Sequence, residues 1–295
     1  MQILATISDT KRVAILLDLK TGRMDSIPVR AEFHDSSVDE GPSFRPFGIT
    51  WERDRIYVVN NRQLLVFDKS LNYLETLAIR LQVNMHQMAY HCGRIWIVSP
   101  RTNSLLVVNP EMIDASTEFN ICEQTLHGYV PRDSLQSDDQ CHFNSLLWSN
   151  GYLFVAAHNF TGPSFIKCYD GTTLKEIRQF TQAGFSIHGL AFFHDELFWL
   201  STRTYEVRSD RGYMHLLSRQ GYARGFSMTS EYFVVAISEA LSRGDRHGGD
   251  SWIQLIDRQK SAMVAEFYLP DTGSVNDLRL LDEYDYAHCL TPFWN

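Results

Sequence analysis

The sequence predicts an all-β fold, a six-bladed β-propeller formed by residues 1–295 as a single domain, from three observations. Aromatic residues make up 13% of the chain, and aromatic side chains favour strands. Apolar runs separated by short polar turns return about every 40 to 50 residues, which is the length of a four-stranded propeller blade. The two ends of the chain each hold only part of such a unit, and together they complete one.

Five stretches start a complete unit, and all follow the same order. An apolar strand is followed by a short turn and by a second strand rich in aromatic and β-branched residues, as in "SLLWSNGYLFVAA", where Asn150-Gly151 is the turn. A more polar fourth strand closes the unit, as in "TLKEIRQF". The third strands often end in an aspartate or asparagine: Asp68, Asn109, Asp170, Asp210 and Asp257. A β-sandwich of irregular hairpins is the alternative, but a sandwich need not repeat one strand order five times.

The sixth blade combines the two ends of the chain. The N-terminal segments "ILATIS", "RVAILLD" and "RMDSIPV" supply three strands without an innermost partner. The segment "SVNDLRLL" supplies an innermost strand over 275–281 but has no room for three more. We therefore expect the N-terminal strands to pair with this C-terminal strand, which removes the open edges that a sheet must otherwise protect.

Polar side chains recur where the innermost strands begin. In a propeller these strands line the central channel, so residues at their starts are expected to gather at the channel mouth. Positions two apart share an orientation along a strand, which places His142 with Asn144. The alternative is that such groups only bond one another and buried water. The aligned positions are Phe47, His86, Asn144, His188, Arg224 and Asn276.

Loops expected on the same face add further candidates. Arg45 precedes the first aligned position, and the loops 158–164 and 201–205 contribute His158 and Arg203. The Gly-rich loop 238–252 contains His247, and its composition suits either a mobile lid or a surface loop. The acidic segments 30–46 and 111–140 are expected to be the other long connections between blades.

Composition and charge exclude several classes of function. The net charge is −8 and no basic run is present, so we expect no nucleic-acid binding. No apolar run approaches the roughly 20 residues that span a bilayer, so no membrane insertion is expected. The glycines match no phosphate-binding pattern, which argues against a nucleotide cofactor. Five cysteines without a CxxC pair, together with the lack of a signal-peptide pattern, predict a cytoplasmic protein.

Five motifs resemble, in the same order, an uncharacterised bacterial β-propeller family that carries a Cys-His-Leu-Asn-Gly signature. The motifs are "HQMAY", "DQCHFNSL", "SIHGLAFFHDELFWL", "ARGFSM…VVAISE" and "SVNDLRLL", within about residues 84 to 282. Here the signature reads Cys141-His142-Phe143-Asn144-Ser145, so its Leu and Gly are replaced. The resemblance implies the fold and marks the same polar residues, but it implies no established reaction.

The layout is more distantly similar to the gluconolactonase and strictosidine synthase-like six-bladed propellers, which work at the channel mouth. The calcium-dependent lactonases among them use Glu, Asn and Asp ligands. The aligned positions of this chain are richer in histidine, so a calcium site is not carried over.

Two functions fit the aligned residues. The first is an enzyme of lyase, isomerase or hydrolase type that acts on a small polar metabolite. His86, His142 and His188 would then be ligands of a divalent metal such as zinc, iron or manganese, or act as general acids and bases. The planar fork of Arg224 suits a carboxylate or phosphate, and Asn144 and Asn276 would bind substrate. The second is a non-catalytic propeller that recognises a sugar, a peptide or a partner protein on the same face. The oligomeric state is left open.

Overall fold

The computed structural model describes residues 1–30, 33, 46–60, 63–77, 85–112, 116–122, 124–128, 141–242 and 245–294, with 125–128 as backbone only. The chain divides into two compact units. Met1–Val29 with Ala183–Asn295 is called the terminal unit, and Arg30–Gln182 the central unit. Each unit contains three antiparallel sheets in which strands follow one another as meanders. Six such sheets confirm the predicted fold class, a six-bladed β-propeller.

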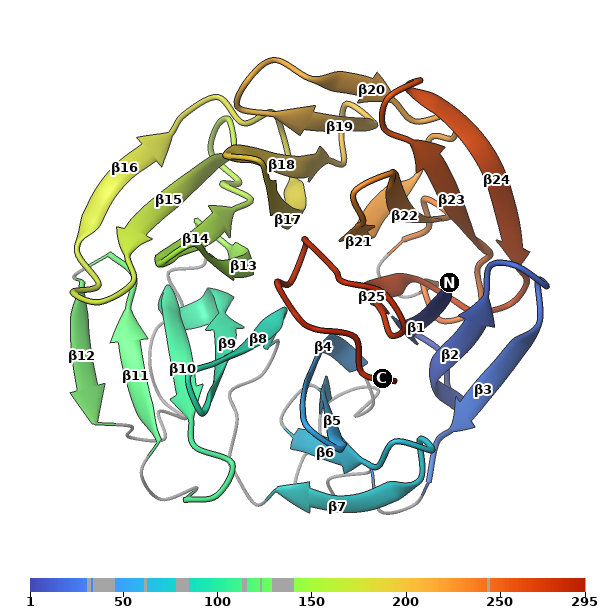
Figure 1. Cartoon of the computed structure of the whole chain (residues 1–295), viewed down its shortest axis with the longest axis horizontal. Helices are drawn as coiled ribbons and strands as arrows, with labels where there is room; N and C mark the ends of the chain where they lie inside the picture. Colours follow the sequence, from blue (N-terminus) through green and yellow to red (C-terminus); the bar gives the residue numbers. More distant parts are fainter. Residues whose placement is uncertain are drawn as a thin grey trace. The chain divides into compact units, whose positions relative to one another are not determined.

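The terminal unit holds the blade that joins the two ends of the chain. Its order is β25-β1-β2-β3, and Leu4 on β1 pairs with Arg279 on β25 (Figure 1). The predicted pairing of the N-terminal strands with the C-terminal inner strand is therefore confirmed. The bounds are β25 Val275–Leu280, β1 Gln2–Ile7, β2 Arg12–Asp18 and β3 Met24–Pro28.

Two further blades complete the terminal unit, and the inner strands of its three blades contact one another in the order β17, β21, β25. The first consists of β17 Ile187–Phe193, β18 Glu196–Ser201, β19 Glu206–Ser209 and β20 Met214–Leu216. The second consists of β21 Tyr222–Met228, β22 Tyr232–Ser238, β23 Ser251–Asp257 and β24 Ala262–Leu269.

The central unit has two four-stranded blades and one of five strands. The four-stranded blades are β4 Pro46–Glu52, β5 Arg55–Asn60, β6 Gln63–Phe67 and β7 Tyr73–Leu77, and β13 Phe143–Ser149, β14 Tyr152–Ala157, β15 Phe165–Asp170 and β16 Glu176–Phe180. The five-stranded blade is β8 Met88–His91, β9 Arg94–Ser99, β10 Ser104–Val108, β11 Thr117–Asn120 and β12 Thr125–Gly128. A 3₁₀ turn, Pro100–Thr102, joins β9 to β10.

The five-stranded blade corrects one expectation. The sequence suggested that 111–140 is an inter-blade connection, but β11 and β12 form within it and extend the sheet of β10. The pattern was hidden because these strands are only four residues long and carry polar side chains.

Turn chemistry explains how the strands reverse. Asn150 and Gly151 have φ of 49° and 79°, as the predicted two-residue hairpin turn requires. Asp170 ends β15, and its Oδ1 accepts the backbone N–H groups of Thr172 at 3.1 Å and Thr173 at 2.7 Å. These bonds, with that from Thr173 first in size, lower the pKa of the Asp170 carboxyl. Asp68 and Asp257 accept backbone N–H groups of the following turn in the same way, whereas Oδ1 of Asp210 accepts the N–H of Leu197.

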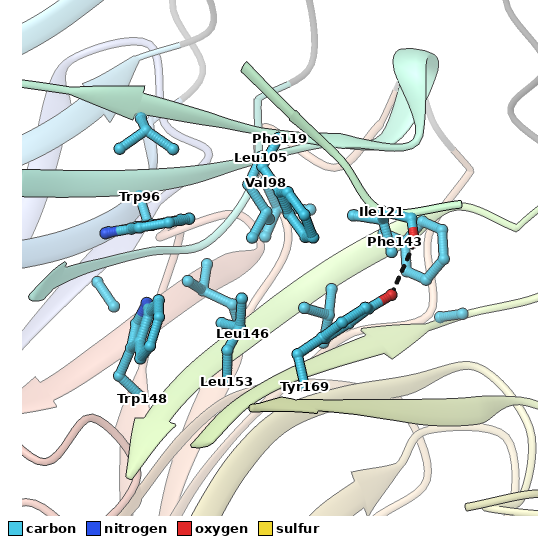
Figure 2. Close-up of a cluster of buried hydrophobic side chains, with 14 residues drawn as sticks. Trp96, Val98, Leu105, Phe119, Ile121, Phe143, Leu146, Trp148, Leu153 and Tyr169 are labelled. Carbon is cyan, nitrogen blue, oxygen red and sulfur yellow. Dashed lines mark hydrogen bonds between the residues drawn. The ribbon is translucent and has the colours of Figure 1, made fainter. Parts of the chain in front are cut away.

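Buried aromatic residues fill the space between neighbouring blades. In the central unit, Trp96 on β9 and Trp148 on β13 meet edge to face at 4.9 Å (Figure 2). Tyr169 is fully buried, and its hydroxyl donates to the carbonyl of Ile121 at 2.8 Å. The aromatic content thus serves as blade packing, and the polar residues at the strand starts remain to be explained.

Candidate functional site

Five of the six inner strands have a β-bulge near their start, and an irregular pair of backbone bonds precedes the sixth, β8. In β13, β21 and β25 the extra residue is the aligned residue itself: Asn144, Arg224 and Asn276. In β17 the bulge follows His188 and places Gly189 as the extra residue. Bulges re-aim side chains and are common next to active sites. The same local distortion therefore presents the predicted residues in both units.

Neighbouring inner strands approach closely at these irregular starts, so small residues are needed there. This is seen at β4 and β17, and β8 also has an irregular start. In β4, Phe47 and Gly48 together face one partner residue, and a Cβ on Gly48 would lie 2.8 Å from the carbonyl oxygen of His86. Before β8, the backbones of His86 and Gln87 both bond to Val98. Gly189 has φ of +58°, and a Cβ there would lie 2.5 Å from Cβ of Phe226. Only glycine fits these positions without displacement.

In the terminal unit, the hydrogen bonds of His188 determine its tautomer. Its Nδ1 lies 3.0 Å from the carbonyl oxygen of Ser186 and 2.9 Å from Oγ1 of Thr202. The Thr202 hydroxyl donates its own proton to the carbonyl of Ala223 at 2.6 Å. Both neighbours of Nδ1 therefore act as acceptors, so the neutral ring carries its proton on Nδ1 and its lone pair on Nε2. His188 is buried with 7% of its surface exposed.

Arg224 and Asn276 are joined across adjacent blades of the same unit. Nη1 of Arg224 lies 3.4 Å from Oδ1 of Asn276, whose Nδ2 donates to Oγ of Ser8 at 3.0 Å. The guanidinium carbon of Arg224 lies 5.6 Å from the centre of the Tyr222 ring, and that of Arg246 lies 4.5 Å from the same centre. Two guanidinium groups thus share one aromatic ring, which concentrates positive charge there.

Arg246 belongs to the predicted loop 238–252, and the described part of that loop is bonded to the connection between β24 and β25. The carbonyl of Arg246 accepts the N–H of Ser274 at 2.9 Å, and that of Gly249 accepts the N–H of Gly273 at 2.8 Å. At the base of the loop, Glu239 donates its N–H to Asp250 at 2.9 Å. These bonds favour a fixed loop over a mobile lid.

In the central unit, five rings form a continuous row, defined here as the ring row: Phe47, His86, His142, His158 and Phe160. Phe47 stacks on His86 with centroids 4.8 Å apart, and His86 meets His142 at 5.1 Å. His142, His158 and Phe160 contact one another at centroid distances of 5.5, 4.7 and 4.9 Å. The imidazoles are partly exposed, and Phe160 is 57% exposed.

The other predicted residue of the central unit, Asn144, is buried with 2% exposure. Its carbonyl accepts the N–H of Gln87 at 3.4 Å, and Oε1 of Gln87 accepts the N–H of Leu146 at 3.1 Å. Gln87 thereby joins the start of β8 to the bulge of β13. This position suits Asn144 for shaping the bulge better than for direct contact with a ligand.

The remaining predicted residues have separate outcomes. Arg203 is exposed in the turn after β18, and His247 is half-buried beside Arg246. Arg45 lies outside the described residues. The convergence of His188 with His86 and His142 stays a prediction, because His188 belongs to the other unit.

Metal binding stays a prediction as well. In the part of the chain that the structure describes, no group of three or more His, Cys, Asp or Glu side chains is placed to hold a metal ion. In the same residues, no helix is long and apolar enough to cross a membrane.

Three participants were not predicted from the sequence. Phe160 looked like a loop residue, and Tyr222 and Arg246 lie in different segments whose proximity depends on the fold. One signal was available, since Tyr222 and Arg224 are two apart on one strand and so share an orientation. The imidazole–aromatic row had no equivalent local signal.

Comparison with known proteins identifies the fold. No protein-family model and no curated protein matches the chain. A structure of a nidogen/laminin complex matches with a TM-score of 0.63 at 10% identity, covering 94% of this chain and 97% of that chain. A protein of unknown function from Bacteroides caccae matches with a TM-score of 0.61 at 9% identity, and apo AztD from Citrobacter koseri matches with a TM-score of 0.53 at 9% identity. Each match covers 94% of this chain and 97% of the other chain. At such identities the likeness shows the fold alone, and by its fold the chain is a six-bladed β-propeller.

Proposed function

We propose that the protein is an enzyme that transfers a proton on a small anionic metabolite, using His188, Arg224 and Asn276 of the terminal unit. The observation that carries this proposal is the fixed Nδ1–H of His188. A histidine whose Nδ1 carries the ring proton has its lone pair on Nε2, and a nitrogen of this kind can act as a general acid or base. Acceptors on two different segments, Ser186 and Thr202, hold the ring in place.

Arg224 is the group that binds the anion. Its guanidinium fork can donate two parallel hydrogen bonds to a carboxylate or a phosphate, and Asn276 orients one nitrogen of the fork by accepting a hydrogen bond from it. Arg246 adds a second positive charge at the same tyrosine ring. A substrate bound by a carboxylate presents an adjacent C–H bond for removal of a proton, because negative charge that develops there is stabilised by nearby cations. Many lyase and isomerase reactions begin with this step, whereas a hydrolase would use the same Nε2 to activate water.

The test is proton exchange with solvent. The protein is incubated in D₂O with a panel of small carboxylates and phosphate esters, and loss of C–H signals is followed by ¹H NMR. His188→Asn keeps an N–H donor for Ser186 and Thr202 but has no basic nitrogen, so exchange should fall about 10²–10⁴-fold while binding persists. Arg224→Gln should instead weaken binding. His194→Asn, at an exposed histidine in the turn between β17 and β18, is the matched control. Unchanged exchange in His188→Asn would contradict the assignment.

Membership of the uncharacterised propeller family and a cytoplasmic location are proposed as well. The order of the five motifs and the residues Cys141, His142 and Asn144 support the family. All five cysteines are free thiols, which supports a reducing compartment. Detection of a disulfide by mass spectrometry of the protein from its native host would argue against that location.

A further inference from the structure

We propose that the ring row of the central unit is a binding site for an uncharged sugar. This inference goes beyond the proposed proton-transfer function and stands on different residues. Its basis is a run of five rings that come from the starts of three inner strands and from the loop after β14.

The chemistry of the row favours a sugar. A sugar ring offers an apolar face of C–H bonds together with a rim of hydroxyl groups, each of which both donates and accepts. Phe160 provides an exposed ring for the apolar face, and aromatic rings combine large contact area with defined geometry. A neutral imidazole has one donor and one acceptor nitrogen, so His142 and His158 match the hydroxyl rim. None of the five members carries a permanent charge, so the row has no group of its own to recognise a phosphate or carboxylate.

The backbone around Phe160 is held in place before any ligand binds. The N–H groups of His158 and Asn159 donate to the carbonyls of His142 and Cys141 at 3.1 and 2.8 Å, and these two bonds continue the pairing of β13 with β14. Asn159 has φ of +52°, and its Nδ2 donates to the carbonyl of Pro163 at 2.7 Å. A preordered loop reduces the entropy lost on binding.

His142 itself adopts the left-handed conformation, with φ of +45°. A residue other than glycine in this region is uncommon and costs about 1–3 kcal/mol, and such strain clusters at ligand sites. The strain turns the chain immediately before β13, and the resulting position of the His142 ring lets it contact His86, His158 and Phe160 together. His142 is therefore the central member of the row.

The experiment uses saturation-transfer-difference NMR on the full chain with methyl glycosides of glucose, galactose, mannose, xylose and N-acetylglucosamine, and with adenosine and uridine as planar neutral competitors. At least one glycoside should bind. Phe160→Ala should weaken that binding about two- to tenfold, since ring stacking contributes about 0.5–1.5 kcal/mol. His142→Asn keeps the left-handed backbone and polar groups without the ring, and should give a similar loss.

Controls separate this site from the proposed enzyme site and from general damage. Ile177→Ala removes an equally exposed apolar side chain, 53% against 57%, from β16 of the same blade and should leave glycoside binding unchanged. Arg224→Gln should leave it unchanged too. Circular dichroism of each variant verifies the fold. The proposal is overturned if no glycoside binds, if only the nucleosides bind, or if folded Phe160→Ala binds glycosides as well as the unaltered protein does.

Discussion

The terminal and central units carry different functional groups at the same structural feature, the β-bulge near the start of an inner strand. In both, β-bulges near the starts of inner strands lie at or next to aligned residues. The terminal unit uses this feature for a buried histidine with a fixed proton and for an arginine held by an asparagine. In the central unit, Phe47 lies in the bulge of β4 and contacts His86, and His142 directly precedes β13, so partly exposed imidazoles meet phenylalanine rings there. The blade repeat therefore determines the position of a functional side chain, and the type of residue at that position determines what it can bind.

The largest expected effect is on the blade that only the terminal unit has, in which both ends of the chain meet. Deletion of residues 1–29 removes β1, β2 and β3 and leaves β25 without its partner strand. Exposed edges pair with other chains, so the truncated protein should be insoluble. Soluble yield and size-exclusion chromatography measure this outcome. A stable monomeric truncation would count heavily against closure by the two ends.

The fold was predictable from the sequence because its signals are local. The strand order recurs in each blade, Asn150-Gly151 is a turn by its own dihedral preference, and Asp170 bonds to the N–H groups that follow it. Each of these features depends on a few neighbouring residues. The position of the inner-strand starts followed from that repeat, and this is why the aligned residues could be named.

The chemistry of the two sites was not predictable to the same depth. A bulge depends on the register between two strands, which hydrophobic alternation does not specify to one residue. The position of the ring proton on His188 depends on Thr202, which lies fourteen residues later in the chain, directly after β18. Phe160 joins the ring row through the conformation of a loop. Pairing and loop conformation are long-range properties, and the sequence shows only the residues that take part in them.

The next largest expected effect is on stability, at the glycines where neighbouring inner strands approach closely in each unit. Gly189→Ala in the terminal unit combines a left-handed backbone with a clash against Phe226, and should lower the free energy of unfolding by about 2–4 kcal/mol. Gly48→Ala in the central unit clashes with the backbone at His86 without a positive φ, and should cost about 1–3 kcal/mol. Gly151→Ala is the matched control, because its φ of +79° is strained but its Cβ would meet nothing, for a cost of about 1–2 kcal/mol.

Urea unfolding of these three variants measures the stabilities, and function should separate the two units. Gly48→Ala should weaken glycoside binding while proton exchange persists, and Gly189→Ala should do the reverse. Equal losses of both activities in either variant would show that the units do not carry independent sites.

The smallest expected effect is a loss of stability at acid pH. It distinguishes a buried histidine of the terminal unit from the partly exposed imidazoles of the central unit. His288 is 3% exposed, and its Nε2 lies 3.3 Å from the carbonyl oxygen of Phe226, an acceptor that places the ring proton on Nε2. Burial, with the nearby Arg279 charge second, holds the pKa of His288 well below its usual value. Above about pH 6.5 both the folded and unfolded states are neutral at this group. Below that pH only the unfolded chain takes up the proton, so stability falls by up to about 1.4 kcal/mol per pH unit.

His288→Gln keeps an N–H donor for Phe226 but cannot titrate, so its stability should fall less between pH 7 and pH 5 than that of the unaltered protein. Asp285 acts in the opposite direction, because burial raises its pKa to about 6 and the folded state then binds the extra proton as the pH falls towards 4. Both proteins contain Asp285, so the difference between their urea midpoints at each pH isolates His288. If the two curves stay parallel from pH 7 to pH 5, the buried histidine of the terminal unit is not the acid-sensitive group, and the partly exposed imidazoles of the ring row become the next groups to replace.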